Sequence, residues 1–243
     1  MANQRWDKEV DVAIVGSGGA GLTAAILAHD NGANVTVFER SDKIGGTTAV
    51  SGGGIWVPLN HHMSEIGAQD SREDALAYCK KLAAGRSSDE LLETFVDTAH
   101  VMLSYLEEHT PVRYRACPMP DYRPEDPGAK TAGRTLDPEM FLKADLGDWA
   151  DKLRPSPLLF VPIKIEESFT AFSQPKSLPV GEIIQRMKDG LVASGNALIG
   201  RLLKGCLDRK IDLQLEARGR ELVREDGRIT GIRIEQGGKD VFV

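Results

Sequence analysis

The sequence predicts an α/β fold that begins with a strand–helix–strand unit and ends in an antiparallel β-meander. Residues 10–16 (VDVAIVG) form a short, almost wholly apolar run, which is typical of a strand buried on both faces. Near position 230, Asp-Gly and Gly-Gly pairs separate short β-rich runs, as they do at tight hairpin turns. These two patterns indicate a parallel unit first and an antiparallel one last.

Composition is that of a soluble globular protein and excludes several function classes. Hydrophobic residues make up 41% and charged residues 27% of the 243 residues, and the formal net charge is -6. That charge argues against nucleic-acid and anionic-membrane partners, which need a basic face. No apolar run reaches membrane-spanning length, and no signal sequence is present, so we expect a cytoplasmic protein. The odd number and wide spacing of Cys79, Cys117 and Cys206 fit a reducing compartment.

The first unit is predicted in three steps. The apolar strand leads into residues 16–32, which show helical spacing of apolar residues and a stop at Gly32. A β-branched run then ends at Glu39. Strand, helix and strand within about thirty residues predict a right-handed βαβ unit.

The middle of the chain predicts helices and then long loops. Residues 71–83 and 87–109 each open with Ser and acidic residues, which suit helix N-termini. Residues 110–180 contain most of the prolines and little periodicity, so we expect loops with short elements there, which are often functional when so long. A helix is predicted through residues 196–210. Strands are then predicted at 211–216, 221–235 and 237–243 as a β-meander.

The turn after the first strand carries a phosphate-binding signature. Gly16-Ser17-Gly18-Gly19-Ala20-Gly21 fits G-x-G-x-x-G between a strand and a helix. Gly16 suits the tight turn, Gly18 the close approach of a pyrophosphate, and Gly21 the close packing of helix and strand. Glu39 lies eighteen positions beyond Gly21, where it can accept hydrogen bonds from a ribose. The pattern predicts dinucleotide binding, with a purely structural turn as the alternative.

A second glycine-rich segment indicates which dinucleotide binds. Residues 45–54 follow the ribose-binding strand directly, as suits an extended FAD rather than a nicotinamide cofactor. A flexible linker is the alternative, but the apolar run IWVP that follows favours burial. The cofactor-binding residues that we predict are Gly16, Ser17, Gly18, Gly19, Ala20, Gly21, Glu39, Arg40, Gly46, Thr47, Thr48, Ser51, Gly52 and Gly53.

These motifs resemble those of a known family. DVAIVGSGGAGLTAA, VFERSDKIGGTTAVSGGGIWVP and ALIGRLL followed by VREDGRITGIRIE are similar to FAD-dependent 3-ketosteroid dehydrogenases, within the fumarate reductase and succinate dehydrogenase flavoprotein group. The resemblance spans nearly the whole chain, and SGGGIWVP, PDYRPEDPGAKTAGR and GNALIGRLL favour the steroid branch. It implies a Rossmann-like, GR2-type FAD-binding domain at 1–60 and 190–243. Residues 61–189 would then begin an α+β substrate or cap domain.

The resemblance also implies a reaction. A base removes a proton beside the ketone of a 3-ketosteroid, hydride passes from the neighbouring carbon to FAD, and an external acceptor reoxidises the cofactor. Tyr122 in PDYRP matches the first Tyr of an Asp-Tyr-Tyr motif that assists the base, whereas Arg123 replaces the second. A Tyr hydroxyl has an ordinary pKa of about 10, so it needs such an environment to act near neutrality. An ordinary packed or surface tyrosine is the alternative.

By the same resemblance, the principal base, the ketone-binding residues and the closing FAD-domain strands follow position 243. We therefore expect a piece of a longer enzyme that alone binds FAD weakly and does not turn over steroid. A fumarate or urocanate reductase-like flavoprotein, which needs an Arg–His carboxylate clamp, is one alternative. A non-catalytic FAD-binding fragment or interaction protein is the other.

Other polar residues predict no additional site. His61 and His62 are adjacent without a sequence-evident carboxylate or Cys partner, which is typical of a solvated loop, so we predict no metal site. A locally basic stretch, which favours ion pairs in a loop over anion binding, contains Arg113, Arg115, Arg123 and Arg134. The Gly-Arg pair at 133–134 matches one in the family, which suggests that Arg134 orients this loop.

Overall fold

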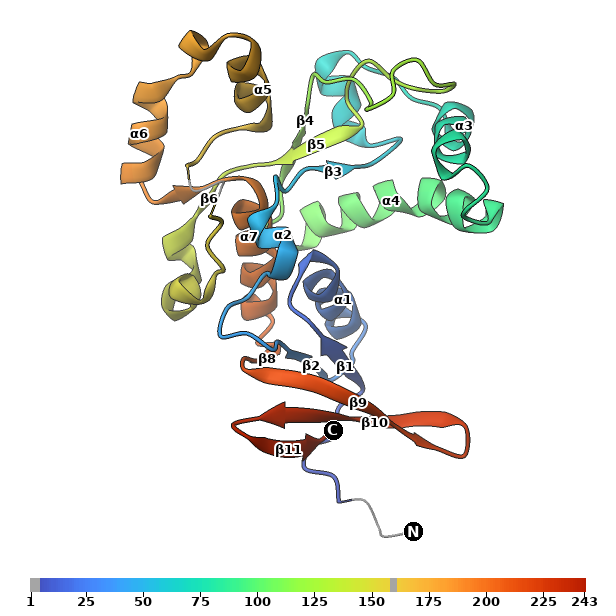
Figure 1. Cartoon of the computed structure of the whole chain (residues 1–243), viewed down its shortest axis with the longest axis vertical. Coiled ribbons are helices and arrows are strands. Elements are labelled where there is room, and N and C mark those ends of the chain that lie inside the picture. The colour runs from blue at the N-terminus through green and yellow to red at the C-terminus, as the bar shows by residue number, and fades with distance from the viewer. Residues whose placement is uncertain (1–4, 158–160) are drawn as a thin grey trace.

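A computed structural model describes residues 5–157 and 161–243. It has a small parallel sheet near its middle, the β-meander at one end, and the strands and helices of residues 55–192 at the other (Figure 1). The parallel sheet has the order β1-β2-β8, formed by β1 (Val12–Val15), β2 (Val35–Phe38) and β8 (Asp212–Gln214).

The predicted βαβ unit is confirmed. β1 pairs in parallel with β2, with Val12 opposite Val35 and Val15 opposite Phe38, and α1 (Gly19–Asp30) connects them. All four residues of β2 are buried, as expected of a central parallel strand, which explains its continuous β-branched and aromatic sequence.

One strand assignment is corrected. The sequence placed residues 211–216 in the meander, but β8 pairs in parallel with β2, on the side away from β1. The reason lies in α7 (Ser194–Asp208), which packs against α1 and returns the chain in the direction that a parallel crossover requires. The short local sequence of β8 carries no signal for this partner.

The meander itself is confirmed. β10 (Arg228–Gln236) pairs antiparallel with β9 (Ala217–Glu225) and with β11 (Lys239–Phe242). The Asp226-Gly227 and Gly237-Gly238 pairs all have positive φ, as a type I′ turn requires. A small apolar cluster attaches the meander to the parallel sheet through Phe38, Ala217, Ile232, Ile234 and Val243.

The two middle helices are also confirmed. α3 (Arg72–Ala83) and α4 (Asp89–His109) begin where Ser71 and Ser88 accept hydrogen bonds from the backbone amides of Asp74 and Leu91. These caps are the chemistry that the sequence signalled. The apolar stripe of α4 is buried at Val96, Ala99, Leu103 and Leu106.

Residues 110–180 hold more regular structure than the sequence suggested. The first helix missed there, α5 (Ile165–Ser173), has no buried residue, and neither does α6 (Val180–Lys188), which begins at the end of this stretch. In α6, apolar Val180, Ile184 and Met187 do recur at helical spacing, so a signal was present but lay next to the proline-rich stretch. The remaining elements are α2 (Gly46–Val50), β3 (Ile55–Trp56), η1 (His61–Ile66), β4 (Tyr114–Ala116), β5 (Thr135–Pro138), β6 (Phe141–Leu142), η2 (Lys143–Lys152), η3 (Pro175–Ser177) and β7 (Leu191–Val192).

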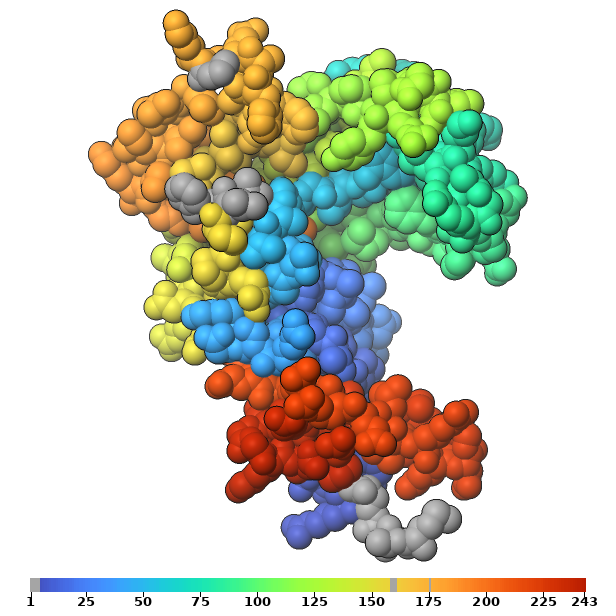
Figure 2. All heavy atoms as spheres, in the orientation of Figure 1, coloured from blue at the N-terminus to red at the C-terminus, as the bar shows by residue number. Residues whose placement is uncertain are grey.

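The largest hydrophobic core joins the parallel sheet to several helices and strands of the described residues. It includes Leu22 and Ile26 of α1, Leu103 of α4, Leu136 of β5 and Leu202 of α7. Figure 2 shows α3 and the start of α4 as an arm on one side, with a hollow between this arm and the meander. Among the described residues, no helix is both long and apolar enough to cross a membrane. The division at residues 60 and 190 stays a prediction.

Candidate functional site

A groove of about 770 Å³ opens where β1 and β2 end and α1 begins. In parallel α/β sheets, ligands bind beyond the carboxyl ends of the strands. The predicted residues in its lining are Gly16, Ser17, Gly18, Gly19, Ala20, Glu39, Arg40, Gly46, Thr47 and Thr48. The lining also includes Val15, Phe38, Val50, Arg154, Ala217, Arg218 and Gly219, which the sequence did not single out.

The first glycine-rich loop has the geometry of a ligand cradle. Gly16 has a φ of +98°, which L side chains rarely adopt, and its amide donates to the carbonyl of Phe38. A Cβ on Gly21 would lie 2.1 Å from the Gly16 carbonyl oxygen, so helix and strand need a glycine there. A Cβ on Gly18 would meet only the Thr48 hydroxyl, at 3.6 Å. Gly18 therefore keeps space free on the groove side rather than within the protein.

Glu39 fastens this loop to the second strand. Its buried carboxylate accepts hydrogen bonds from the Ser17 amide at 3.0 Å, the Ser17 hydroxyl at 2.5 Å and the Ser41 amide at 2.9 Å. An ionised carboxylate has about four acceptor sites, so capacity remains for one ribose hydroxyl. Glu39 thus has a structural task in addition to the one predicted.

The start of the second glycine-rich segment closes the other side of the groove. The hydroxyl of Thr48 accepts the Gly19 amide at 3.1 Å, and the Gly45 amide donates to the Ser17 hydroxyl at 3.0 Å. These bonds hold α2 beside the N-terminus of α1. The positive end of the α1 dipole and its free amides favour an anion here.

The end of that segment packs against the protein instead. Ser51, Gly52 and Gly53 do not line the groove. The Ser51 carbonyl accepts the Gly195 amide at 3.0 Å, and a Cβ on Gly53 would lie 2.4 Å from the Ser194 backbone. Here the glycine content allows backbone to meet backbone at the N-terminus of α7. A role for these three residues in binding the cofactor stays a prediction.

Arg154 is a groove residue that sequence reasoning missed. Its Nε is a buried donor without a hydrogen-bond partner among the described residues, and the side chain lines the groove. Burying an unsatisfied charged donor is costly, so this atom fits an anionic ligand such as a pyrophosphate. Asn196 positions the segment, because its amide donates to the carbonyls of Ala49 and Arg154. In the sequence, Arg154 is only a basic residue in a stretch without a recognisable pattern, so nothing marked it as a cofactor-binding residue.

The loop of Tyr122 is anchored by its neighbours. Buried Asp121 accepts hydrogen bonds from the Trp56 indole at 2.7 Å and from Arg134 at 2.9 Å. The fully buried Arg134 side chain also pairs with Asp70 at 2.6 Å, which agrees with its predicted role in orienting the loop. Tyr122 itself is 96% exposed. Its catalytic role stays a prediction.

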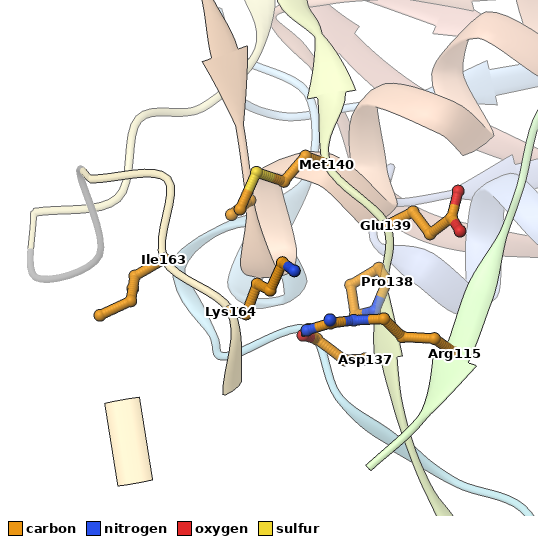
Figure 3. A pocket seen from close by; sticks show the side chains of 8 residues that line it. Arg115, Asp137, Pro138, Glu139, Met140, Ile163 and Lys164 are labelled. Atoms are coloured by element: carbon orange, nitrogen blue, oxygen red, sulfur yellow. The ribbon is translucent and has the colours of Figure 1, made fainter. Parts of the chain in front are cut away.

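A second pocket, of about 310 Å³, lies beside β4 and β5 (Figure 3). Arg115 pairs there with Asp137 at 2.5 Å and with Glu166 at 3.0 Å, and Lys164 also lines the pocket. Burial raises the pKa of the Asp137 carboxyl despite this pairing. Charged walls of this kind do not suit an apolar polycyclic ligand. The ion pairs agree with the predicted role of Arg115.

One expectation about histidines is wrong. His62 does not lie in a solvated loop without carboxylate partners: it is 8% exposed and its Nε2 lies 3.0 Å from the Glu107 carboxylate. Sequence proximity could not reveal this partner, which comes from the last turn of α4, 45 residues away.

A comparison with protein families identifies the domain. A model of the FAD binding domain matches residues 11–243. The chain belongs to the FAD binding domain family. FAD is therefore its cofactor, and the cradle at Gly18, the spare acceptor of Glu39 and the unsatisfied Arg154 fit that group.

Individual relatives of this FAD-binding chain are named as dehydrogenases. It is 37% identical over 93% of its length to 4-oxocyclohexanecarboxylate 2-dehydrogenase of Sinomonas cyclohexanicum, covering 40% of that protein. It is 33% identical over 93% of its length to 3-oxosteroid 1-dehydrogenase of Mycolicibacterium smegmatis, covering 42%. The structure of 3-ketosteroid delta1-dehydrogenase from Sterolibacterium denitrificans in complex with 1,4-androstadiene-3,17-dione matches with a TM-score of 0.89 at 33% identity. That match covers 96% of this chain and 45% of the other. The chain thus spans less than half the length of these relatives.

Proposed function

We propose that the protein acts as an FAD-dependent dehydrogenase that introduces a double bond beside a ring ketone, with a 3-ketosteroid as substrate. The observation that carries this proposal is the similarity, over more than nine-tenths of the chain, to dehydrogenases of ring ketones. A GR2-type arrangement of the Rossmann-like domain is part of the same proposal. The substrate loses a proton from the carbon beside the ketone and a hydride from the next carbon, which leaves a carbon–carbon double bond.

The residues of the groove would bind and orient the cofactor. FAD, when bound, supplies the hydride acceptor. Glu39 would accept a hydrogen bond from the ribose, and the N-terminus of α1 with Arg154 would neutralise the pyrophosphate. Gly46, Thr47 and Thr48 would hold the same group from the other side. Reoxidation by an external electron acceptor completes the cycle.

Tyr122 would assist proton removal at the substrate side. Asp121 and Arg134 fix the backbone next to it, while the exposed side chain is left able to turn toward a substrate. A Tyr122→Phe variant should lower kcat while FAD binding stays unchanged, because the side chain is remote from the lining of the groove. Equal loss of FAD affinity in that variant would show a structural role instead.

Two substrate classes compete within this reaction. The relative of Sinomonas cyclohexanicum is named for a small ring ketone that carries a carboxylate, and its identity to this chain exceeds that of the steroid enzyme. A 4-oxocyclohexanecarboxylate-type substrate is therefore the second candidate. Reduction of fumarate or urocanate is a third, which no residue in the described part of the chain favours.

The test is anaerobic reduction of the bound flavin. Because this chain spans less than half the length of its relatives, the test uses the yellow full-length flavoprotein. It is mixed with a 3-ketosteroid, with 4-oxocyclohexanecarboxylate, or with reductant followed by fumarate. We expect bleaching by the 3-ketosteroid together with formation of a ring double bond in the product. Bleaching only by 4-oxocyclohexanecarboxylate would make small ring ketones the substrate class. Reoxidation of the reduced flavin by fumarate, without bleaching by either ketone, would contradict the proposal.

A further inference from the structure

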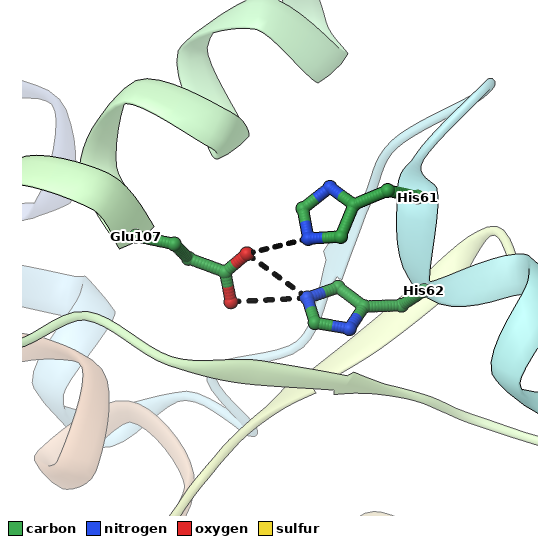
Figure 4. A group of neighbouring side chains, drawn as sticks. All are labelled: His61, His62 and Glu107. Atoms are coloured by element: carbon green, nitrogen blue, oxygen red, sulfur yellow. Dashed lines mark hydrogen bonds and ion pairs between the residues drawn. The ribbon is translucent and has the colours of Figure 1, made fainter.

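Two histidines and a glutamate converge on one point away from the FAD groove (Figure 4). His61 and His62 come from η1, and Glu107 comes from the end of α4. Nε2 of His61 lies 3.0 Å from Oε2 of Glu107, and Nε2 of His62 lies 3.0 Å from both carboxylate oxygens. The three potential ligand atoms lie within 4.8 Å of one another.

His62 has a carboxylate at each ring nitrogen. Its Nδ1 lies 3.0 Å from Oε1 of Glu65, opposite the contact of Nε2 with Glu107. A neutral imidazole carries one N–H, so it can donate to one of these carboxylates and would repel the other. If Nδ1–H donates to Glu65, Nε2 presents its lone pair beside the Glu107 carboxylate, where a metal ion could lie between them.

We propose that His61, His62 and Glu107 bind a divalent transition-metal ion of the zinc class. Two imidazole nitrogens and one carboxylate, with a fourth position open to water, form a donor set that such ions accept. Ligand atoms around a tetrahedral zinc ion lie roughly 3.3 Å apart, given metal–ligand distances of about 2.0 Å. The two contacts of 3.0 Å with Glu107 thus need to open only slightly, and the two imidazole nitrogens lie within 4.8 Å of each other.

Neighbouring groups orient these ligands. The bond from Nδ1–H of His62 to Glu65 would leave Nε2 free for the metal, as carboxylates do for metal-bound histidines. The Tyr114 amide donates to Oε1 of Glu107 at 2.8 Å, so Oε2 can turn to the metal. The His62 and Glu107 side chains are only 10% and 11% exposed, so two of the three ligands are already held in place and shielded from solvent.

An entry path is present. The His61 side chain is half exposed and lines a surface cleft of about 420 Å³, together with Asn60 and Ser64. A metal ion and its remaining water can reach His61, the exposed ligand, from this cleft. Once bound, the ion would link η1 to the end of α4 and so fix the residues that precede α3.

The test is a titration with Co²⁺, followed by competition with Zn²⁺, on the purified protein without a histidine tag and with FAD present. We expect one equivalent of Co²⁺ with the visible absorption of tetrahedral coordination, and displacement by Zn²⁺. Glu107→Gln and His61→Ala should weaken Co²⁺ binding at least 100-fold, and Glu65→Gln about 10-fold or more, as loss of an orienting carboxylate does.

Glu108→Gln is the matched control, because this neighbouring carboxylate is 75% exposed and lies 3.7 Å from a single histidine, His109. It should bind Co²⁺ like the wild type. His61→Ala keeps the test valid if the buried variants fail to fold, since its side chain is half exposed. No Co²⁺ absorption in the folded wild type, or equal affinity in wild type, Glu107→Gln and His61→Ala, would overturn the proposal and leave a hydrogen-bonded cluster.

Discussion

The two glycine-rich segments beside the groove at the start of α1 contain similar residues for different physical reasons. A Cβ on Gly18, in the first segment, would meet only the Thr48 hydroxyl at 3.6 Å. A Cβ on Gly53, in the second, would lie 2.4 Å from the Ser194 backbone, at a φ of +72°. The first glycine keeps space for a ligand, and the second keeps space for the protein's own helix.

This difference teaches that a glycine-rich sequence does not by itself identify a binding loop. Only the start of the second segment, around Thr48, contributes to the groove, whereas its end holds the N-terminus of α7. The two reasons predict separate consequences. Substitution should cost FAD affinity in one segment and stability in the other.

The largest effect is expected for Gly53→Ala. The added Cβ meets backbone atoms that cannot turn away, and the left-handed conformation is strained for alanine, so the free energy of unfolding should fall by about 3 kcal/mol. Urea unfolding of the FAD-free protein measures this change. Gly52→Ala is the control, because nothing lies within 4 Å of its Cβ position. Equal stability of the two variants would contradict the packing role of Gly53.

A smaller effect, on the cofactor alone, is expected for Gly18→Ala. Its backbone is extended and its Cβ has room in the protein, so stability should be unchanged. A methyl group in the path of the pyrophosphate should cost about 1–3 kcal/mol, which weakens FAD binding roughly 10- to 100-fold. Quenching of flavin fluorescence measures the affinity. Gly181→Ala, at an open position of α6, should bind FAD like the wild type.

Arg154→Met removes the positive charge from the groove but keeps a side chain of similar length. Loss of a charge-assisted hydrogen bond should weaken FAD binding about tenfold, since such bonds contribute about 1.5 kcal/mol or more. The FAD-free protein should not lose stability, because the Arg154 Nε has no hydrogen-bond partner in the described structure. Arg224→Met in the exposed meander controls for net charge. Unchanged FAD affinity in Arg154→Met would remove this residue from the site.

The sequence predicted the elements whose signals are local. The βαβ unit, α3, α4 and the type I′ turns follow from apolar spacing, capping serines and Asp-Gly or Gly-Gly pairs. It missed what depends on distant partners. β8 joins β2 only because α7 directs it there, and Arg154 reaches the groove from a loop with no pattern.

The same limit applies to the histidine cluster and to the second glycine-rich segment. Glu107 approaches His62 from another helix, and Gly53 meets Ser194 across about 140 residues of chain. No spacing rule connects such pairs. Composition could show that residues 45–54 needed close approach, but it could not distinguish a cofactor from α7 as the neighbour.

The smallest effect concerns the C-terminal ends of α1 and α7, where Asp30 pairs with Arg209. Two hydrogen bonds from Arg209, at 2.6 and 2.7 Å, lower the pKa of the Asp30 carboxyl below its ordinary value. The stabilising charge is therefore fully present above about pH 4 and is lost as pH falls toward the lower pKa of the folded state. Asp30→Asn should flatten the decline of unfolding free energy between about pH 4 and about pH 2.

Urea unfolding at several pH values measures this slope, with the more exposed Asp42→Asn as control. A slope equal to that of the wild type in Asp30→Asn would show that the Arg209 contact does not link the helices. The contacts of Gly53 and Ser51 with the N-terminus of α7 would not be affected by that result.

The most direct test of the account measures two quantities on two variants. The FAD affinity and the unfolding free energy of the FAD-free protein are determined side by side for Gly18→Ala and Gly53→Ala. We predict that Gly18→Ala loses FAD affinity at wild-type stability, and that Gly53→Ala loses stability in the absence of FAD. Parallel losses of both quantities in both variants would contradict the separation of a ligand cradle from a packing segment.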